Sequence, residues 1–217
     1  GLLFWRSMTQ WIGGLGIIMF TIAVLPIFGV SGLQVFAAEA SGPTHDKVHP
    51  RIGITAKWIW GIYTGLTFIL VILLMLGGMN WFDSICHAFA TTGTGGFSTK
   101  QASVAYYHSP YIEYVISLFM FVSGINFTLL LFFVNRKFKK VIDNAELKWY
   151  FWSVTGFTTV IAVILYYTSS MGMEEAFRKS LFQVISLHTS TGFATDDYML
   201  WTPILWGLLT IVMIMGA

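Results

Sequence analysis

Charged residues are scarce in this sequence. Asp, Glu, Lys and Arg together make up 10% of its 217 residues, whereas an ordinary soluble domain carries about 25%. Hydrophobic residues make up 56%. The composition therefore predicts a membrane protein and argues against a soluble domain.

Cysteines and catalytic motifs are also few or missing. Cys86 is the single cysteine, which excludes an intrachain disulfide and a cysteine-based metal cluster. The net charge of +2 gives no sign of a nucleic-acid partner. No nucleophile, general base or cofactor motif stands out, so the sequence predicts neither an enzyme nor a cofactor.

Long apolar stretches account for most of the chain. A helix needs about 20 apolar residues to cross a hydrocarbon core roughly 30 Å thick, and we predict an all-α membrane protein on that basis. The chain begins without a methionine or a charged signal segment and ends while still apolar, so we expect an internal fragment of a longer protein. The predicted spans are residues 11–30, 54–79, 110–134, 149–168 and 200 to the end.

The positive charges predict the orientation of these spans, because cytoplasmic loops hold an excess of Lys and Arg. Eight such residues lie in or beside the loops at 31–53 and 135–148, against four on the opposite side. Both loops are then cytoplasmic, in a multi-pass protein of the cell (inner) membrane. The sequence "NRKFKK" at 135–140 is interpreted as a topology anchor, the alternative being a dedicated lipid or nucleic-acid site.

Two apolar pieces, 81–92 and 173–188, are too short to cross and are predicted to be re-entrant helices. Each is followed by a loop rich in glycine and hydroxyl residues, called here the first glycine loop (93–99) and the second glycine loop (189–195). An offset of 96 residues places Gly-Phe-Ser-Thr on Gly-Phe-Ala-Thr. The predicted organisation is the closing helix of a first unit (1–30), a second unit (54–134, short helix about 82–92) and a truncated third unit (149–217, short helix about 174–188).

The ends of the short helices predict a preference for cations. Asp83 is a candidate N-cap of the first, and Glu174 and Glu175 sit at the start of the second, where acids favour the positive end of the helix dipole. The partly negative C-terminal ends then point toward the glycine loops. Two such ends directed at one point favour a cation there.

The glycine loops have the composition of a selectivity filter, in which backbone carbonyls replace the water shell of an ion. Non-helical backbone at membrane depth needs a partner of this kind, and glycine allows the positive φ that the conformation demands. A glycine-rich surface turn is the alternative for one loop alone, and the spacing of a phosphate-binding loop is lacking. The predicted carbonyl ligands are Gly93, Thr94, Gly95, Gly96, Thr189, Ser190, Thr191 and Gly192, with Phe97, Phe193, Thr99 and Thr195 as support behind them.

The histidines and the paired aspartates near the loops leave two interpretations each. His87 and His188 lie in or at the ends of the short helices, and His188 suits hydrogen bonding behind a filter. A transition-metal site is the alternative that the spacing of these histidines, and of His45 and His49, does not favour. Asp196 and Asp197 either concentrate cations at an outer mouth or cap the following turn.

Four motifs together resemble the Trk/Ktr/HKT superfamily of potassium transporters, and most closely its bacterial Trk-type membrane subunits. They are "FWRSMTQWIGGLGIIMF" at 4–20, "LQVFAAEASGP" at 33–43, "HAFATTGTGGFST" at 87–99 and "HTSTGFATDDY" at 188–198. The resemblance implies four helix–pore-loop–helix units around one potassium path, with one filter glycine in each. Gly96 and Gly192 are then the filter glycines of the second and third units.

The resemblance also implies a function and partners for the parent protein. It implies the ion-conducting subunit of a potassium uptake system in contact with membrane lipid, forming a homodimer and bound by a cytosolic nucleotide-binding regulatory subunit. Potassium is the transported ion, not a cofactor. The alternatives are a sodium- or proton-coupled cation transporter, a membrane scaffold, or a membrane-embedded enzyme using His188 with Asp196 or Asp197.

Overall fold

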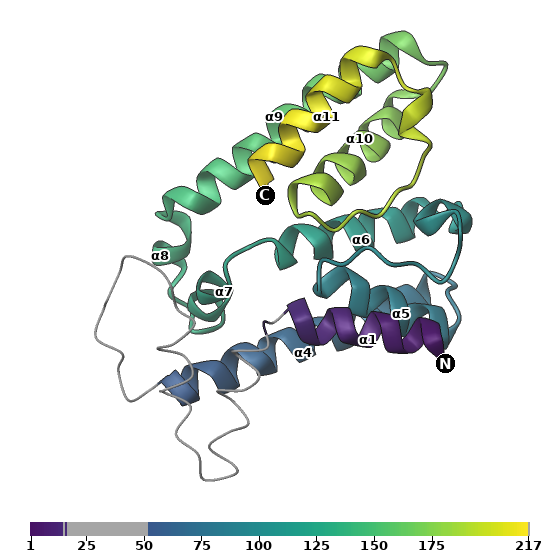
Figure 1. The fold of residues 1–217 in the computed structure, drawn as a ribbon. Coiled ribbons are helices and arrows are strands. Elements are labelled where there is room, and N and C mark those ends of the chain that lie inside the picture. Colours follow the sequence, from purple (N-terminus) through teal and green to yellow (C-terminus); the bar gives the residue numbers. More distant parts are fainter. Residues whose placement is uncertain (15, 17–51, 217) are drawn as a thin grey trace.

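The structure is a computed structural model that describes residues 1–14, 16 and 52–216. Within these residues all regular secondary structure is helical, which confirms the all-α prediction (Figure 1). The remainder of the first predicted span, the loop at 31–51 with His45 and His49, and the motif at 33–43 lie outside the described residues. The elements are α1 Leu2–Gly14, α4 Ile52–Leu76, α5 Trp81–Thr92, η2 Ser103–Tyr107, α6 Pro110–Ser123, α7 Phe127–Val134, α8 Phe138–Ile142, α9 Ala145–Thr168, α10 Met173–His188, η3 Tyr198–Leu200 and α11 Pro203–Gly216.

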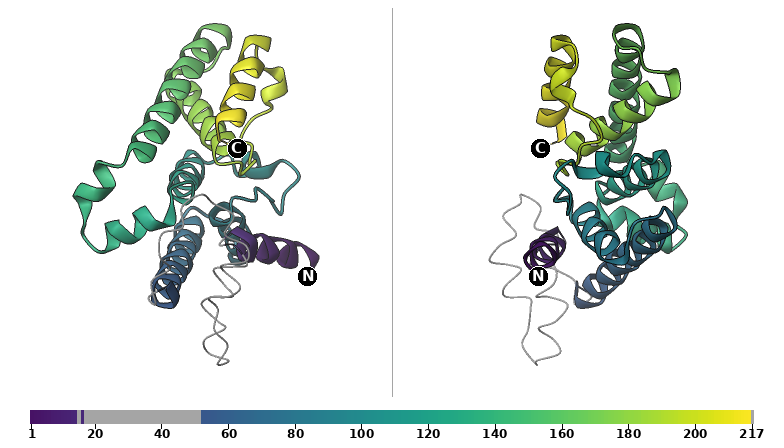
Figure 2. Two further views of the ribbon diagram at one scale, coloured as in Figure 1. Left: turned by 60° about the vertical axis from the view of Figure 1, so that its left-hand side comes forward. Right: turned by 90° about the vertical axis from the view of Figure 1, so that its right-hand side faces the viewer.

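The two short helices α5 and α10 have the same kind of surroundings. Helix α5 packs against α1, α4 and α6, while α10 packs against α6, α9 and α11 (Figures 1 and 2). Each therefore contacts the first helix of its own unit, the closing helix of its own unit and the closing helix of the unit before. Helix α6 belongs to both groups and joins them.

The start of α5 differs from the sequence prediction. Asn80, not Asp83, is the N-cap: its side-chain oxygen accepts a hydrogen bond from the Asp83 amide at 2.8 Å. The Asn80 amide group in turn donates to the Asp83 carboxylate at 2.8 Å, a reciprocal arrangement related to the capping box. The prediction of Asp83 as N-cap was wrong, because the asparagine three residues earlier takes that role and frees the carboxylate for other partners.

The third predicted span, 110–134, is divided in the structure. Helix α6 begins at Pro110 after the N-cap Ser109 and ends at the C-cap Gly124, and α7 begins at Phe127. Gly124 lies where α6 passes the end of α10, since a Cβ atom added to it would meet Thr189 Cγ2 and the Tyr150 hydroxyl, each at 2.7 Å. This close approach, which hydropathy does not reveal, accounts for the glycine at the break.

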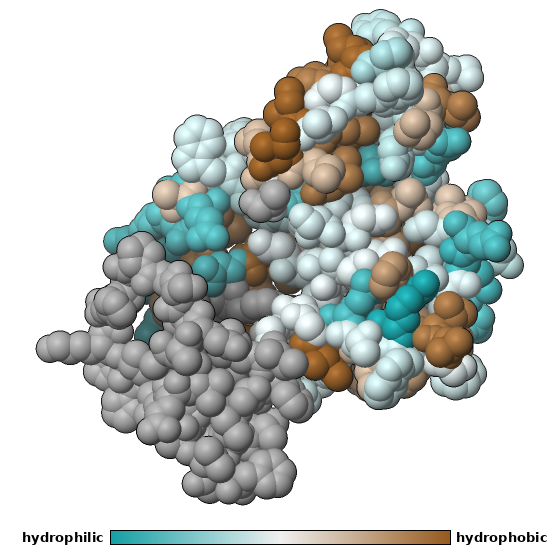
Figure 3. All heavy atoms as spheres, viewed as in Figure 1, coloured by the Kyte–Doolittle hydropathy of each residue, from teal (hydrophilic) through white to brown (hydrophobic). Residues whose placement is uncertain are grey.

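Apolar surface covers the outer helices. Among the described residues, 57–76 of α4 and all of α9 are long and apolar enough to cross a membrane, while the apolar helices α6 and α11 have 14 residues each. Hydrophobic side chains lie along α9 and α11 on the surface shown in Figure 3. The interior between the helices around α5 and those around α10 is also apolar, with Ile116, Phe182 and Phe193 fully buried. Apolar surface both outside and inside is typical of helices that lie in lipid.

Candidate functional site

The two glycine loops repeat one unusual backbone conformation. Thr94 and Ser190, which are equivalent at the offset of 96 residues, have φ angles of 48° and 54°. Gly96 and Gly192 have φ angles of 65° and 85°. A positive φ is uncommon for a residue with a side chain and readily adopted by glycine. The repeat seen in the sequence is therefore a repeat of backbone geometry.

Amide groups in both loops point back to the short helix before them. The Gly96 amide donates to the Ala90 carbonyl at 3.3 Å, and the Gly192 amide donates to the equivalent Ser186 carbonyl at 3.2 Å. The amides of Thr94 and Ser190 likewise donate to carbonyls in the last turn of the short helices, those of Thr91 and Leu187. Several loop carbonyls are thus left available to another partner. Among the predicted ligands, the carbonyls that accept no hydrogen bond from a described residue belong to Gly93, Thr94, Gly96, Thr189, Ser190, Thr191 and Gly192.

Two carbonyls of the first glycine loop already have side-chain donors. The Gln10 side-chain amide of α1 donates to the Gly95 carbonyl at 2.9 Å, and the Arg6 guanidinium donates to the Ser98 carbonyl at 2.7 Å. The sequence interpretation missed both residues, since only the fold brings the closing helix of the first unit to the loop of the second. Gln10 and Arg6 fix the first glycine loop from outside its own unit.

The two loops contact each other at their glycines. A Cβ atom added to Gly96 would lie 1.9 Å from the Thr191 carbonyl oxygen. Further along, the Ala105 amide donates to the Ala194 carbonyl at 3.3 Å, and the Ser103 hydroxyl accepts from the Ala194 amide at 3.3 Å. The two glycine loops therefore lie side by side.

The aromatic residues that follow the glycines reach back toward the preceding unit. Phe193 is fully buried and stacks on the His87 ring of α5, with ring centroids 5.8 Å apart. The guanidinium carbon of Arg6, on α1, lies over the Phe97 ring, 4.2 Å from the centroid of that ring. Phe193 thus packs behind the first loop, whereas Phe97 is 42% exposed in this chain.

The histidines are placed for hydrogen bonding. His87 is fully buried, with Nε2 2.9 Å from the Ser98 hydroxyl and Nδ1 2.8 Å from the Asp83 carbonyl. His188 Nε2 lies 2.8 Å from the Ser153 hydroxyl of α9. Across the described ranges, no group of three His, Cys, Asp or Glu side chains is arranged to hold a metal ion. These contacts favour the supporting role over a transition-metal site.

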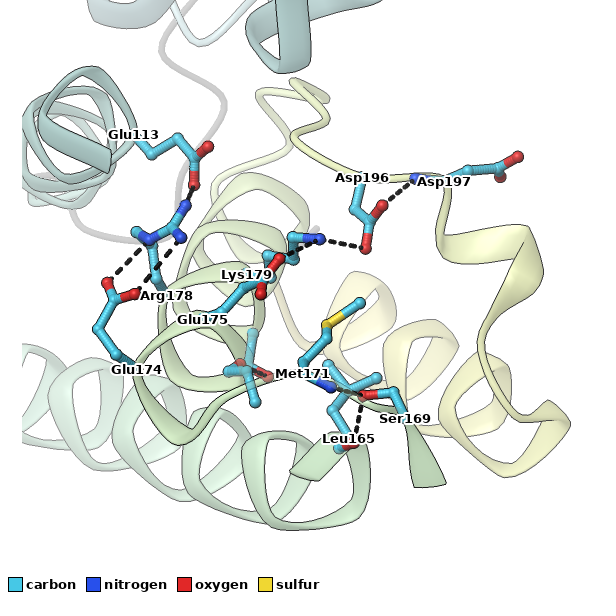
Figure 4. A network of polar contacts seen from close by, with 12 residues as sticks. Glu113, Leu165, Ser169, Met171, Glu174, Glu175, Arg178, Lys179, Asp196 and Asp197 are labelled. Carbon is cyan, nitrogen blue, oxygen red and sulfur yellow. Dashed lines mark hydrogen bonds and ion pairs between the residues drawn. The ribbon is translucent and has the colours of Figure 1, made fainter. Parts of the chain in front are cut away.

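An ion pair ties the residue after each glycine loop to the short helix before that loop. Lys100 Nζ lies 3.1 Å from Asp83 Oδ2, and Thr99 Oγ1 donates to the other carboxylate oxygen at 2.5 Å. After the second loop, Asp196 Oδ2 lies 3.1 Å from Lys179 Nζ (Figure 4). The sequence carries a signal for these contacts that was missed, because the offset of 96 residues pairs Asp83 with Lys179 and Lys100 with Asp196.

The two aspartates predicted at the outer mouth have different environments. Asp196 is paired with Lys179 and also accepts from the Trp201 indole at 3.2 Å. Asp197 is exposed and caps η3, accepting from the Met199 amide at 3.1 Å. Capping is therefore present at Asp197, and the charge of Asp196 is largely balanced by its partner.

A partly buried arginine joins α6 to α10. The Arg178 guanidinium of α10 donates to the Glu113 carboxylate of α6 and to Glu174 one turn earlier on α10, the latter at 2.9 Å (Figure 4). The side chains of Arg178 and Glu113 are only 11% and 7% exposed, whereas that of Glu174 is 61% exposed. The hydrogen bonds from Arg178 lower the pKa of the Glu174 carboxyl. Arg178 therefore holds α6 against α10 and balances two acids.

These features together define a class of protein. Paired short helices, each ending in a loop with open carbonyls within an all-α fold, are an arrangement typical of cation-transporting membrane proteins. The model of the TrkH family, described as cation transport protein, matches residues 1–217. The chain belongs to this family, which is a family of transporters and not of enzymes.

Individual relatives agree with this assignment. The chain is 35% identical over 218 residues to the Trk system potassium uptake protein TrkH of Halomonas elongata, covering 100% of this chain and 45% of that protein. It is 39% identical over 207 residues to TrkH of Escherichia coli (strain K12), covering 92% and 42%. The crystal structure of the potassium transporter TrkH from Vibrio parahaemolyticus superimposes with a TM-score of 0.79 at 33% identity, covering 97% and 43%. The chain thus spans less than half the length of these relatives.

Proposed function

We propose that the protein containing this chain conducts potassium across the cell membrane as the ion-conducting subunit of a Trk-type uptake system. The observation that carries this proposal is the repeated loop geometry, with open carbonyls at Thr94, Gly96 and Gly192 and amides tied back to the short helices. A potassium ion that loses its water needs such oxygen ligands. The printed names of the relatives, which are potassium uptake proteins, point to the same ion.

The proposed ligands are the backbone carbonyls of both loops, with the supporting residues behind them. Gly95 is the exception among the predicted ligands, because its carbonyl already accepts from Gln10. Since a carbonyl oxygen has two lone pairs, Gly95 can still contribute a secondary contact. Phe193 packs on His87 and Thr99 bonds to Asp83, and both support the first loop. Phe97 and Thr195 take the corresponding places beside the first unit and in the second loop.

The proposed setting follows from the charges and from the family. Both glycine loops face the outside of an inner membrane, and the loops at 31–53 and 135–148 face the cytoplasm. There a nucleotide-binding regulatory subunit docks on a homodimer of the full-length protein. The basic residues at 135–140 act as the anchor for this orientation.

Growth under potassium limitation tests the proposal. A strain lacking its own uptake systems, supplied with the full-length protein, is expected to grow at low potassium. Gly96→Ser is expected to remove this growth and Gly192→Ser to weaken it, because both residues have a positive φ but only a side chain at residue 96 also meets the Thr191 carbonyl. Normal growth of both variants would favour a scaffold over a conductor. Growth that depends on sodium or on a proton gradient would favour the coupled transporter.

Asp197 provides a test of the outer mouth. Asp197→Asn is expected to raise the potassium concentration for half-maximal uptake by about twofold at low ionic strength and to change it little in high salt, since screening weakens an exposed charge. The measurement is rubidium uptake against concentration at two ionic strengths. An unchanged affinity at low ionic strength would leave Asp197 with its capping role alone.

A further inference from the structure

Two ion pairs occupy equivalent positions in the second and third units with opposite polarity. Lys179 follows Asp83 by 96 residues, and Asp196 follows Lys100 by the same number, the offset that places Gly192 on Gly96. In the second unit the acid is on the short helix and the base follows the loop, whereas in the third unit the order is reversed. Both pairs measure 3.1 Å between nitrogen and oxygen.

The reversal indicates what these positions require. Each pair joins the first half of a short helix to the residue directly after the glycine loop, so that most of the helix and the whole loop lie between the partners. Neither pair adds net charge near the loop. A role in attracting the ion would need one sign, whereas a role in holding the loop needs only attraction between the two points.

The pairs are sheltered enough to act as ties. The side chains of Asp83 and Lys179 are 4% and 15% exposed, and those of Lys100 and Asp196 are 28% and 26% exposed. Ion pairs on an open surface contribute little, but attraction strengthens as water is excluded. The partner on the helix is the more buried one in both units.

The threonine hydroxyls next to the two ion pairs differ in a way that matches the reversed polarity. Thr99 donates to Asp83, but in the third unit the position equivalent to Asp83 is occupied by Lys179, which offers the equivalent Thr195 no acceptor. The Thr195 hydroxyl is buried and has no hydrogen-bond partner in the part of the chain that the structure describes. An acid at position 179 would restore the acceptor that Thr99 has in the second unit.

We infer that the two ion pairs are positioning devices that hold each glycine loop against its own short helix and thereby set the preference of the pore for potassium over sodium. The inference rests on the proposed function. Discrimination between the two ions depends on where the carbonyl oxygens lie. A loop released at its outer end can close around the smaller ion, so the loss of a pair lowers selectivity before it stops conduction.

Charge exchange in the third unit tests this inference. In the full-length protein reconstituted into liposomes, Lys179→Asp and Asp196→Lys each place like charges together and are expected to lower the ratio of potassium to sodium flux by about tenfold. The double variant Lys179→Asp/Asp196→Lys reproduces the polarity of the second unit and is expected to recover most of the ratio. Rescue of this kind distinguishes a pair from two separately important side chains.

The control is Glu175→Gln, which removes the other carboxylate partner of Lys179, 3.0 Å away, and is expected to keep the wild-type ratio. If the single reversals fail to reach the membrane, Lys179→Gln replaces them, because it removes the attraction without adding repulsion. A wild-type ratio in the single variants, or no recovery in the double variant, would overturn the inference. Gly192→Ser in the same liposomes distinguishes failure of this inference from failure of the proposed function. If this variant conducts potassium normally, the proposed function itself is wrong.

Discussion

Gly96→Ala is expected to abolish potassium uptake by the full-length protein. The added methyl group would lie 1.9 Å from the Thr191 carbonyl oxygen, at a residue whose φ is 65°. The left-handed conformation alone costs an alanine about 1–2 kcal/mol, and the overlap forces the two loops apart at the point where they meet. The measurement is the initial rate of rubidium uptake, normalised to the amount of protein in the membrane.

Gly192→Ala and Gly156→Ala are the matched comparisons for this result. Gly192 has a φ of 85° but nothing within 4 Å of an added Cβ atom, so its variant bears only the conformational strain and is expected to retain part of the uptake. Gly156, in α9, has open space as well and no positive φ, and its variant is expected to behave as wild type. Equal uptake by the Gly96 and Gly192 variants would contradict the close contact between the loops.

Arg178→Met is expected to lower the free energy of unfolding by about 3 kcal/mol or more, because removal of one partner leaves the other charge of a buried pair uncompensated. That charge is Glu113 of α6, whose side chain is 7% exposed. Since the pair joins α6 to α10, the loss weakens the contact between the second and third units. The measurement is thermal or denaturant unfolding of the purified protein in detergent.

Two further variants separate this effect from a general loss of charge. Glu174→Gln removes the exposed partner of Arg178 and is expected to have a much smaller effect, as surface pairs contribute little. Arg178→Met combined with Glu113→Gln removes both buried charges and is expected to regain most of the lost stability. If the double variant is as unstable as Arg178→Met alone, the buried charge is not the cause.

Much of the local structure could be predicted from sequence patterns. Length and hydropathy indicated the helices and marked 81–92 and 173–188 as short, because a helix of that size cannot cross the hydrocarbon core. The glycine loops were predicted from a sequence repeat in which Gly96 and Gly192 are followed by similar residues. These features depend on residues close together in the chain, which is why one sequence is enough to find them.

Contacts between units could not be predicted in this way. Gln10 and Arg6 reach the first glycine loop from a helix some 85 residues earlier in the chain, and no local pattern marks them. The start of α5 is a different case, because Asn80, as good an N-cap residue as Asp83, directly precedes the predicted short helix, and the sequence therefore carried this local signal. The division of the third predicted span at Gly124, by contrast, depends on where α10 ends against α6.

The position of a bound ion tests the central proposal most directly. Crystals of the full-length protein grown with rubidium or thallium would give an anomalous signal at each cation site. The account predicts a peak on the ion path in contact with the carbonyl oxygens of Gly96 and Gly192, which Gly96→Ser removes. A transport-competent protein whose cation sites lie away from both glycine loops would contradict it.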